Sequence, residues 1–439
     1  MLDEHPGPVL RRLIRWLTPF KACFGHRAEA VSLGGYVAGL LSDSPRKSMQ
    51  AMLARVTAAP AYHAVQHFIT NAPWSALRMW RVLRAELPER RGLLLLDDTG
   101  FPKKGTESVG VARQYSGTLG KIGNCQVAVT AALWTGARAW LVAAALYLPE
   151  TWTSDPARCQ RAHVPESIQF RKKWQIALRL LQHVRASGIT ITGVLSDSGY
   201  GDATTFRTAL HRLKLPYGLG ISESLTVFLD PPQLELPRPV KGPRLRHPRA
   251  KLGATAPPVS VKAVAEAWPA EAWQRVTWQN GDQPARGGLC AAVRVTPAHD
   301  WKQGRLLPEI WLLMERPDDR VGVTKYYFVN LPRRTRLARL VQFVHQRWPI
   351  EQQYQQLKTE LGLDHFEGRT YPGWNHHVVV SAVAYAFLQQ ERLQRDDSAL
   401  TFEAVHAIVQ DIFVGLLFAS RPRYMQWLEE AQRLLPLRL

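Results

Sequence analysis

The sequence is short of acidic residues, of cysteines and of long apolar runs. Its 36 Asp and Glu residues stand against 56 Lys and Arg residues, which gives 439 residues a formal net charge of +20. Its four cysteines show no CxxC spacing, so we expect free thiols in a reducing compartment, with neither a zinc site nor a disulfide framework. The longest apolar runs, such as 140–148 and 378–388, fall short of the roughly 20 residues that a membrane-spanning helix needs. The first residues also lack the pattern of a signal peptide, and we expect no membrane segment.

The excess of positive charge indicates a polyanionic partner. A protein this basic usually binds nucleic acid or an anionic membrane surface, and the shortage of apolar runs favours nucleic acid.

Hydrophobic periodicity divides the chain into five expected segments. Apolar residues three and four apart predict an N-terminal helical domain, which we interpret as DNA-binding, although a helical cap with no partner is the alternative. Strand patterns alternating with helices then predict an α/β mixed sheet, and a β-rich stretch with a basic, proline-rich loop interrupts it. The expected segments are 1–90 (helical), 91–221 (first part of the core), 222–332 (β-rich insertion), 333–395 (second part of the core) and 396–439 (C-terminal helical).

Two of the expected strands end in aspartates. LLLLDDTGFPKKG (93–105) runs from leucines into Asp97 and Asp98, and ITGVLSDSGYGD (191–202) reaches Asp197. A strand that leaves the core for a solvated turn explains either pattern. Strand ends at one sheet edge also commonly present ligands, so these carboxylates are candidate metal ligands.

A third acid lies on an expected helix within 335–369. Pro349 would break a helix interior but is tolerated in the first turn of a new helix, so we expect a kink or restart there, with Glu351 in the first turn. Arg347, Glu351 and Lys358 then share one face, which could be only a surface row of ion pairs. Three carboxylates on three separate elements favour a site for two divalent cations, because such ions need oxygen ligands brought together from distant segments.

Several blocks of the sequence resemble the bacterial insertion-sequence transposases with a DDE triad, and more narrowly the insertion-sequence 701-type group, which is related to the hairpin-forming insertion-sequence 4 superfamily. The blocks occur in family order over most of the chain: YHAVQHFITNAPW (62–74), DDTGFPKKGTESVGVARQYSGTLGKIGNCQVAV (97–129), LPETWTSDPARC (148–159), SDSGYGD (196–202), TKYYFVNLP (324–332) and RWPIEQQYQQLKTELGLDHFEGR (347–369). The resemblance implies an RNase H-like core, with the β-rich insertion between the second Asp and the Glu.

The resemblance also implies roles for individual residues. The family motif aligns the second of the adjacent aspartates, so it implies Asp98 rather than Asp97 as the first catalytic acid and metal ligand, followed by Asp197 and Glu351. Arg347, Glu351 and Lys358 match the family signature Tyr-x2-Arg-x3-Glu-x6-Lys, but Val344 stands at its tyrosine. Trp348 matches a tryptophan that holds a flipped base, and a core anchor for the helix is the alternative.

The basic residues near these motifs are candidate DNA contacts. Lys103 and Lys104 follow the first strand, and a purely structural role is their alternative. The basic loop is usually only solvated, but beside a nucleic-acid site it would grip phosphates. The full candidate set for DNA binding is Lys103, Lys104, Arg347, Trp348, Lys358, Lys241, Arg244, Arg246, Arg249 and Lys251.

The resemblance implies a cut-and-paste DNA transposase. Such an enzyme binds terminal inverted repeats, cleaves the ends with two Mg²⁺ ions, for which Mn²⁺ can substitute, and joins the ends to target DNA. It implies double-stranded DNA as partner, a homodimer in the synaptic complex, and a cytoplasmic, nucleoid-associated location in a bacterium. The alternatives are a DNA-binding protein that has lost catalysis and a stand-alone metal-dependent nuclease.

Overall fold

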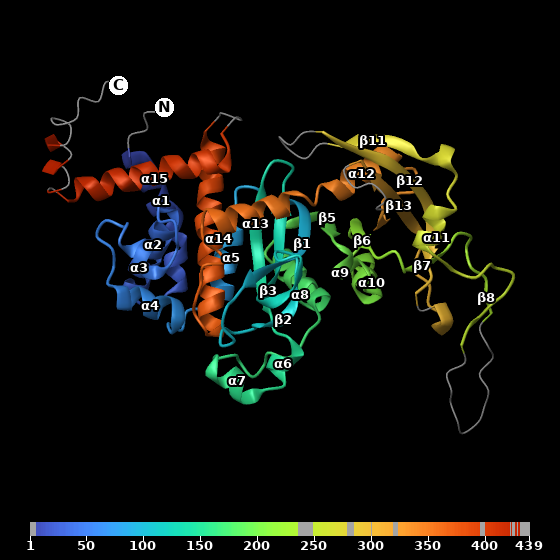
Figure 1. Ribbon diagram of the computed structural model, residues 1–439, viewed down its shortest axis with the longest axis horizontal. Coiled ribbons are helices and arrows are strands. Elements are labelled where there is room, and N and C mark those ends of the chain that lie inside the picture. Colours follow the sequence, from blue (N-terminus) through green and yellow to red (C-terminus); the bar gives the residue numbers. More distant parts are fainter. Residues whose placement is uncertain are drawn as a thin grey trace.

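The chain forms an elongated molecule with helices at one end, a sheet in the middle and further strands at the other end (Figure 1). We describe it from a computed structural model, which covers residues 6–235, 249–278, 285–299, 301–318, 324–395, 400–421, 423, 426–427 and 429–430.

The centre of the molecule is a mixed sheet in the strand order β4–β3–β1–β5–β6. β1 pairs antiparallel with β3 and parallel with β5, β3 pairs antiparallel with β4, and β5 pairs parallel with β6. The leucines 94–96 are completely buried because helices cover both faces, which explains the unbroken apolar run. The strands are β1 (Arg91–Pro102), β3 (Lys121–Trp134), β4 (Ala139–Tyr147), β5 (Thr190–Ser196) and β6 (Tyr217–Ile221), and the short β2 (Ala112–Ser116), which the sequence did not predict, pairs with the start of β3.

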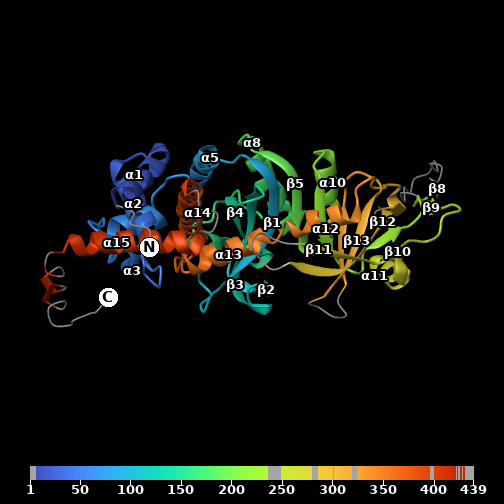
Figure 2. The ribbon, with the colours of Figure 1, turned by 90° about the horizontal axis from the view of Figure 1, so that it is seen from above.

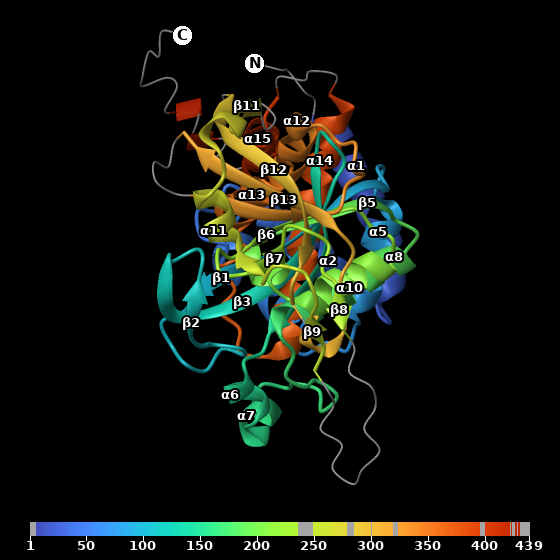
Figure 3. The same cartoon turned by 90° about the vertical axis from the view of Figure 1, so that its right-hand side faces the viewer.

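Residues 222–332 are rich in strands, as expected, and most of these strands continue the same sheet. β14 pairs antiparallel with β6, with Phe328 opposite Leu219, and β13, β12 and β7 follow outward (Figure 3). The insertion is therefore joined to the core through backbone hydrogen bonds. Its elements are β7 (Thr226–Phe228), β8 (Leu234–Glu235), β9 (Lys251–Leu252), β10 (Val259–Ser260), α11 (Val261–Glu266), η2 (Ala270–Ala272), β11 (Gln274–Trp278), β12 (Arg286–Pro297), η3 (Trp301–Gln303), β13 (Ile310–Pro317) and β14 (Lys325–Val329).

Helices cover both faces of the central strands. α8 packs on β3 and β4 from one face, and α13 crosses β1 and β4 on the other (Figure 2). The predicted break at Pro349 is confirmed, because one helix ends at His345 and the next begins at Pro349. The helices of this part are α6 (Glu150–Thr153), α7 (Pro156–Arg161), α8 (Lys173–Ala186), α9 (Ser198–Gly201), α10 (Thr204–Arg212), α12 (Leu337–His345) and α13 (Pro349–Thr359).

The N-terminal part is helical, as predicted, and packs around a long helix from the other end of the chain. α14 (Tyr371–Gln394) is apolar all round because it lies between β4 and the N-terminal helices. An ion pair of 2.6 Å joins Arg12 to the buried Glu391, and the Tyr36 hydroxyl lies 2.9 Å from Nδ1 of His377. The two ends of the described chain therefore share one core, formed with α14 and α15 (Phe402–Ala419) by α1 (Pro6–Leu17), η1 (Pro19–Cys23), α2 (Arg27–Leu41), α3 (Met49–Leu53), α4 (Tyr62–Thr70) and α5 (Ala76–Glu86).

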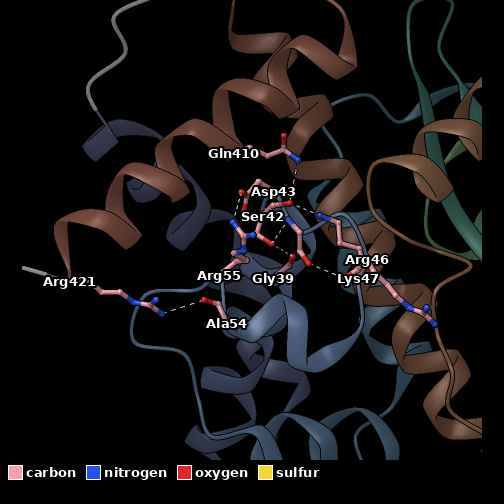
Figure 4. Close-up of polar contacts among 10 residues, drawn as sticks. Gly39, Ser42, Asp43, Arg46, Lys47, Ala54, Arg55, Gln410 and Arg421 are labelled. Atoms are coloured by element: carbon pink, nitrogen blue, oxygen red, sulfur yellow. Dashed lines mark hydrogen bonds and ion pairs between the residues drawn. The ribbon is translucent and has the colours of Figure 1, made fainter. Parts of the chain in front are cut away.

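Polar contacts fasten α15 to the loop after α2 (Figure 4). Gln410 donates to the carbonyl oxygen of Ser42 at 3.3 Å, and the buried Nζ of Lys47 donates to the same oxygen at 2.5 Å. Burial lowers the pKa of Lys47 to about 8. In the part of the chain that the structure describes, α15 alone is long and apolar enough to cross a membrane, with a mean hydropathy of 1.6 and 33% of it buried. By itself this is weak evidence for a span, because core helices of other proteins have the same length and hydropathy.

Candidate active site

Two of the predicted acids meet where the pairing of β1 with β5 ends. The strands are parallel neighbours, and Leu96 is paired with Ser196. Asp97 is the next residue of β1, and Asp197 is the first residue after β5. The expected strand end at Asp97 and Asp98 is wrong, because β1 stays paired with β3 as far as Pro102. Asp197 also caps the short helix α9, because its Oδ1 accepts a hydrogen bond from the backbone N–H of Gly199 at 3.1 Å.

The adjacent aspartates Asp97 and Asp98 point to opposite faces of β1, as neighbours in a strand must. The Asp97 carboxylate is 8% exposed and lies 2.6 Å from a guanidinium nitrogen of Arg347. The Asp98 carboxylate instead lies 3.0 Å from Nζ of Lys173 on α8, and the Tyr200 hydroxyl donates to it at 3.5 Å. Asp97, and not the expected Asp98, thus faces the helix that carries the third acid.

The third acid reaches this edge because α13 crosses the strands at a fixed place. Tyr354 of α13 lies with its hydroxyl 2.5 Å from Oγ1 of Thr130, and Thr130 is paired with Asp97 across β1 and β3. Pro349 occupies the first turn of α13, where its missing N–H costs nothing, and Glu351 follows in that turn. Arg347 forms ion pairs with both Asp97 and Glu351 and so joins the first and third acids.

Burial and Arg347 have opposite effects on the pKa values of the carboxylates at this edge. The pKa of Asp97 is raised to about 7, chiefly by burial and also by the neighbouring Asp197 and Asp98, against the opposing effect of Arg347. Burial also raises the pKa of Asp197, with Arg347 again opposing the shift. Burial alone would lower the pKa of Arg347, but Asp97, Glu351 and Asp197 together raise it. The site therefore favours an additional cation near its carboxylates.

A cavity of about 720 Å³ opens beside the acids, between the core and the insertion. Asp197, Arg347 and Glu351 line it from the core, and the half-buried Trp348 joins them. Residues of the insertion and of α12 complete the wall, among them Trp278, Arg286, Lys325, Tyr326 and His345. Nothing in the sequence marked these residues, because only the continuation of the sheet through β14 brings them to the acids.

Comparison with known proteins places the chain in a family. Residues 19–285, more than half of the chain, match the model of the DDE superfamily endonucleases, a range that includes Asp97, Asp98 and Asp197 and ends before Glu351. The chain belongs to the DDE superfamily endonucleases. It is also 30% identical, over 240 residues, to the probable transposase of insertion sequence element IS701 from Microchaete diplosiphon; the match covers 53% of this chain and 60%, less than two thirds, of that protein.

A solved structure is also similar to this DDE endonuclease. It is the cryo-EM structure of the piggyBac transposase synaptic complex with hairpin DNA, with 8% sequence identity, a TM-score of 0.44, and coverage of 94% of this chain and 77% of that one. This likeness is too remote to support an inference about the chain.

DDE endonucleases imply a divalent metal, and the donor set of this site fits one. The candidate ligands Asp97, Asp197 and Glu351 offer carboxylate oxygens, which hard divalent cations prefer. As the side chains lie, no three His, Cys, Asp or Glu residues in the described ranges are grouped closely enough to hold an ion. In this arrangement Arg347 forms ion pairs with Asp97 and Glu351, and Lys173 forms one with Asp98.

The predicted DNA-binding residues of this DDE endonuclease differ in what they contact. Nζ of Lys103 donates to the carbonyl oxygen of Phe366 at 2.6 Å, and Nζ of Lys358 donates to that of Gly100 at 2.9 Å. Burial lowers the pKa of both lysines. Both side chains thus fasten β1 to α13 and the loop after it, which is the structural role that stands as the alternative for Lys103.

The other basic candidates lie at the surface or cannot be placed. Lys104, Arg249 and Lys251 are exposed, so their charges are available to a polyanion. Lys241, Arg244 and Arg246 lie outside the described residues.

Proposed function

We propose that this protein is a cut-and-paste DNA transposase that cleaves the ends of its element and joins them to target DNA. The observation that carries the proposal is the convergence of Asp97 within β1, Asp197 after β5 and Glu351 on α13 around the guanidinium of Arg347. The fold supports an RNase H-like core, because three antiparallel strands, β4–β3–β1, are followed by two strands parallel to β1.

Asp97 is the first acid of the proposed triad, in place of Asp98. Asp97 lies on the face of β1 that α13 covers, and Arg347 joins it directly to Glu351. Asp98 lies on the α8 face, where Lys173 neutralises it. In this arrangement Asp98 and Lys173 support the strand end, and Asp97, Asp197 and Glu351 hold the metal.

The chemistry is phosphoryl transfer. Two Mg²⁺ ions, or Mn²⁺ in their place, would supply activation of the attacking water or 3′-hydroxyl and charge stabilisation at the leaving oxygen. This chain's own residues bind and orient the DNA. The exposed Lys104 contacts a backbone phosphate beside the end of β1. Arg347 exchanges its ion pairs with Asp97 and Glu351 for a contact with the DNA. Trp348, at the cavity wall, stacks on a base extruded during hairpin formation.

The proposed partners are the terminal inverted repeats of the element, the target DNA and a second copy of the chain that brings the two ends together. The proposed location is the bacterial cytoplasm, at the nucleoid.

The test is cleavage of a labelled duplex that carries the element's own end, identified as the inverted repeats flanking the coding sequence. The parent protein should cut this duplex with Mg²⁺ or Mn²⁺ and not with EDTA. Asp97→Asn, Asp197→Asn and Glu351→Gln should each lower cleavage by at least about 100-fold, while Asp98→Asn should retain most of it. Normal cleavage by Glu351→Gln would refute the triad, and loss of cleavage in Asp98→Asn with normal cleavage in Asp97→Asn would restore Asp98 as first acid.

The products of the same assay separate the rival functions. End binding without metal-dependent cutting would identify a DNA-binding protein that has lost catalysis. Cutting without joining to target DNA would identify a stand-alone nuclease.

A further inference from the structure

A buried glutamate that is not one of the three proposed acids holds a histidine at the wall of the cavity. Glu315 of β13 is completely buried, and its Oε2 lies 2.7 Å from Nε2 of His345. Its other oxygen, Oε1, lies 3.7 Å from Nζ of Lys325 and has no hydrogen-bond partner among the described residues. A carboxylate buried this far needs compensation from nearby cations or donors. His345 and Lys325 supply it from two different elements.

The imidazole ring of His345 is fixed in orientation as well as in position. It stacks on the indole of Trp278, with ring centroids 3.9 Å apart and planes 15° from parallel. Nε2 is turned to Glu315, so Nδ1 is the nitrogen left for another molecule, and in the described ranges it has no hydrogen-bond partner. The side chain is 13% exposed and lines the same cavity as Asp197 and Glu351.

We propose that His345 binds a DNA phosphate in this cavity through Nδ1, with Glu315 as its positioning residue and Lys325 beside it. The proposal rests on the proposed function, since it places DNA in the cavity. A phosphate oxygen only accepts hydrogen bonds, and Nε2 already donates to Glu315. Only the doubly protonated ring can donate at both nitrogens. The proposed contact therefore requires a proton on both ring nitrogens.

The charges around the ring are consistent with this role. Glu315, Lys325 and Trp278 face the ring or the carboxylate that holds it. The cavity that His345 lines also carries two arginines and three acids, none of which is hydrogen-bonded to His345: Arg286, Arg347, Asp197, Glu223 and Glu351.

The test is DNA binding without metal, measured by fluorescence anisotropy with a labelled random-sequence duplex in EDTA. At about pH 5.5, His345→Gln should bind roughly tenfold more weakly than the parent protein, because one charged phosphate contact is lost. The slope of log K against log salt should also fall by about 1.

His211→Gln is the matched control, because His211 is exposed on α10 and does not line the cavity. It should match the parent protein. Glu315→Gln should keep the ring in place through the amide oxygen, and it should weaken DNA binding less than His345→Gln does. If Glu315→Gln does not fold, the DNA affinity of His345→Gln is by itself the test of the proposal.

Unchanged DNA affinity and an unchanged salt slope in His345→Gln would overturn the proposal. The outcome is independent of cleavage. If His345→Gln weakens DNA binding as expected but the parent protein does not cut element ends, the proposed transposase activity is refuted and the phosphate contact is not.

Discussion

The substitution Asp97→Asn should make the metal-free protein more stable at neutral and alkaline pH. Asn has almost the same shape as Asp, and its side-chain oxygen can still accept the hydrogen bond that Oδ1 receives from the backbone N–H of Asp98 at 2.8 Å. The substitution removes a negative charge that burial disfavours.

The magnitude follows from the pKa of Asp97 in the folded protein. Burial first, and then the neighbouring carboxylates, raise it from 3.8 to about 7, although Arg347 opposes the shift. Because the folded state holds this proton more tightly than the unfolded chain, stability falls as pH rises between about 4 and about 7 and is constant above that range. One pKa unit corresponds to about 1.36 kcal/mol, so the gain in Asp97→Asn at pH 8 has a ceiling of about 4 kcal/mol.

The assay is urea denaturation in EDTA, followed by tryptophan fluorescence at a series of pH values. The difference in free energy of unfolding between variant and parent should grow from near zero at about pH 4 to its full value above about pH 7. Mg²⁺ should then stabilise the parent protein and not the variant, because the variant lacks one ligand charge.

Asp98→Asn provides the control for this experiment. It breaks the 3.0 Å ion pair with Lys173 and should lower stability by about 1 kcal/mol. A variant Asp97→Asn that is less stable than the parent, by the same amount at every pH, would refute the reasoning. That result would mean that the ion pair with Arg347 outweighs burial.

Three further predictions concern other parts of the site. Glu351→Gln should abolish metal-dependent cleavage in a gel assay and leave DNA affinity within about threefold, since its carboxylate serves the metal. Gly201→Ala should lower the free energy of unfolding by about 3 kcal/mol or prevent folding, because a Cβ at this position would lie 1.9 Å from the carbonyl oxygen of Gly220. Lys103→Ala should lower the melting temperature, because Nζ of Lys103 is hydrogen-bonded to backbone carbonyl oxygens. Lys104→Ala should leave the melting temperature unchanged and reduce the salt slope of DNA binding by about 1, because Lys104 is exposed. The opposite pattern would exchange the two roles.

Much of the local structure was predictable because it depends on neighbouring residues. The apolar run before Asp97 predicted a buried strand, and Pro349 predicted the start of a helix with Glu351 in its first turn. Both follow from side-chain burial and backbone sterics, which act over a few residues.

The choice between Asp97 and Asp98 was not predictable in the same way. Alternation along a strand shows that the two side chains point to opposite faces, but not which face carries α13. The sequence motif favoured Asp98, whereas the packing of α13 against Thr130, through Tyr354, puts Asp97 beside Glu351. The backbone contacts of Lys103 and Lys358 were not predictable for a related reason, since their carbonyl partners lie on segments far away in the chain.

By itself, the sequence determined the positive charge, most of the order of strands and helices, and the presence of candidate acids on three separate elements. The tertiary structure alone decided which acids share a face, which lysines are tied down, and that Glu315 and His345 meet at the cavity. The physical reason is that propensity and periodicity are properties of short segments. The contacts of a site, in contrast, depend on the sheet order and helix crossings that bring residues hundreds of positions apart together.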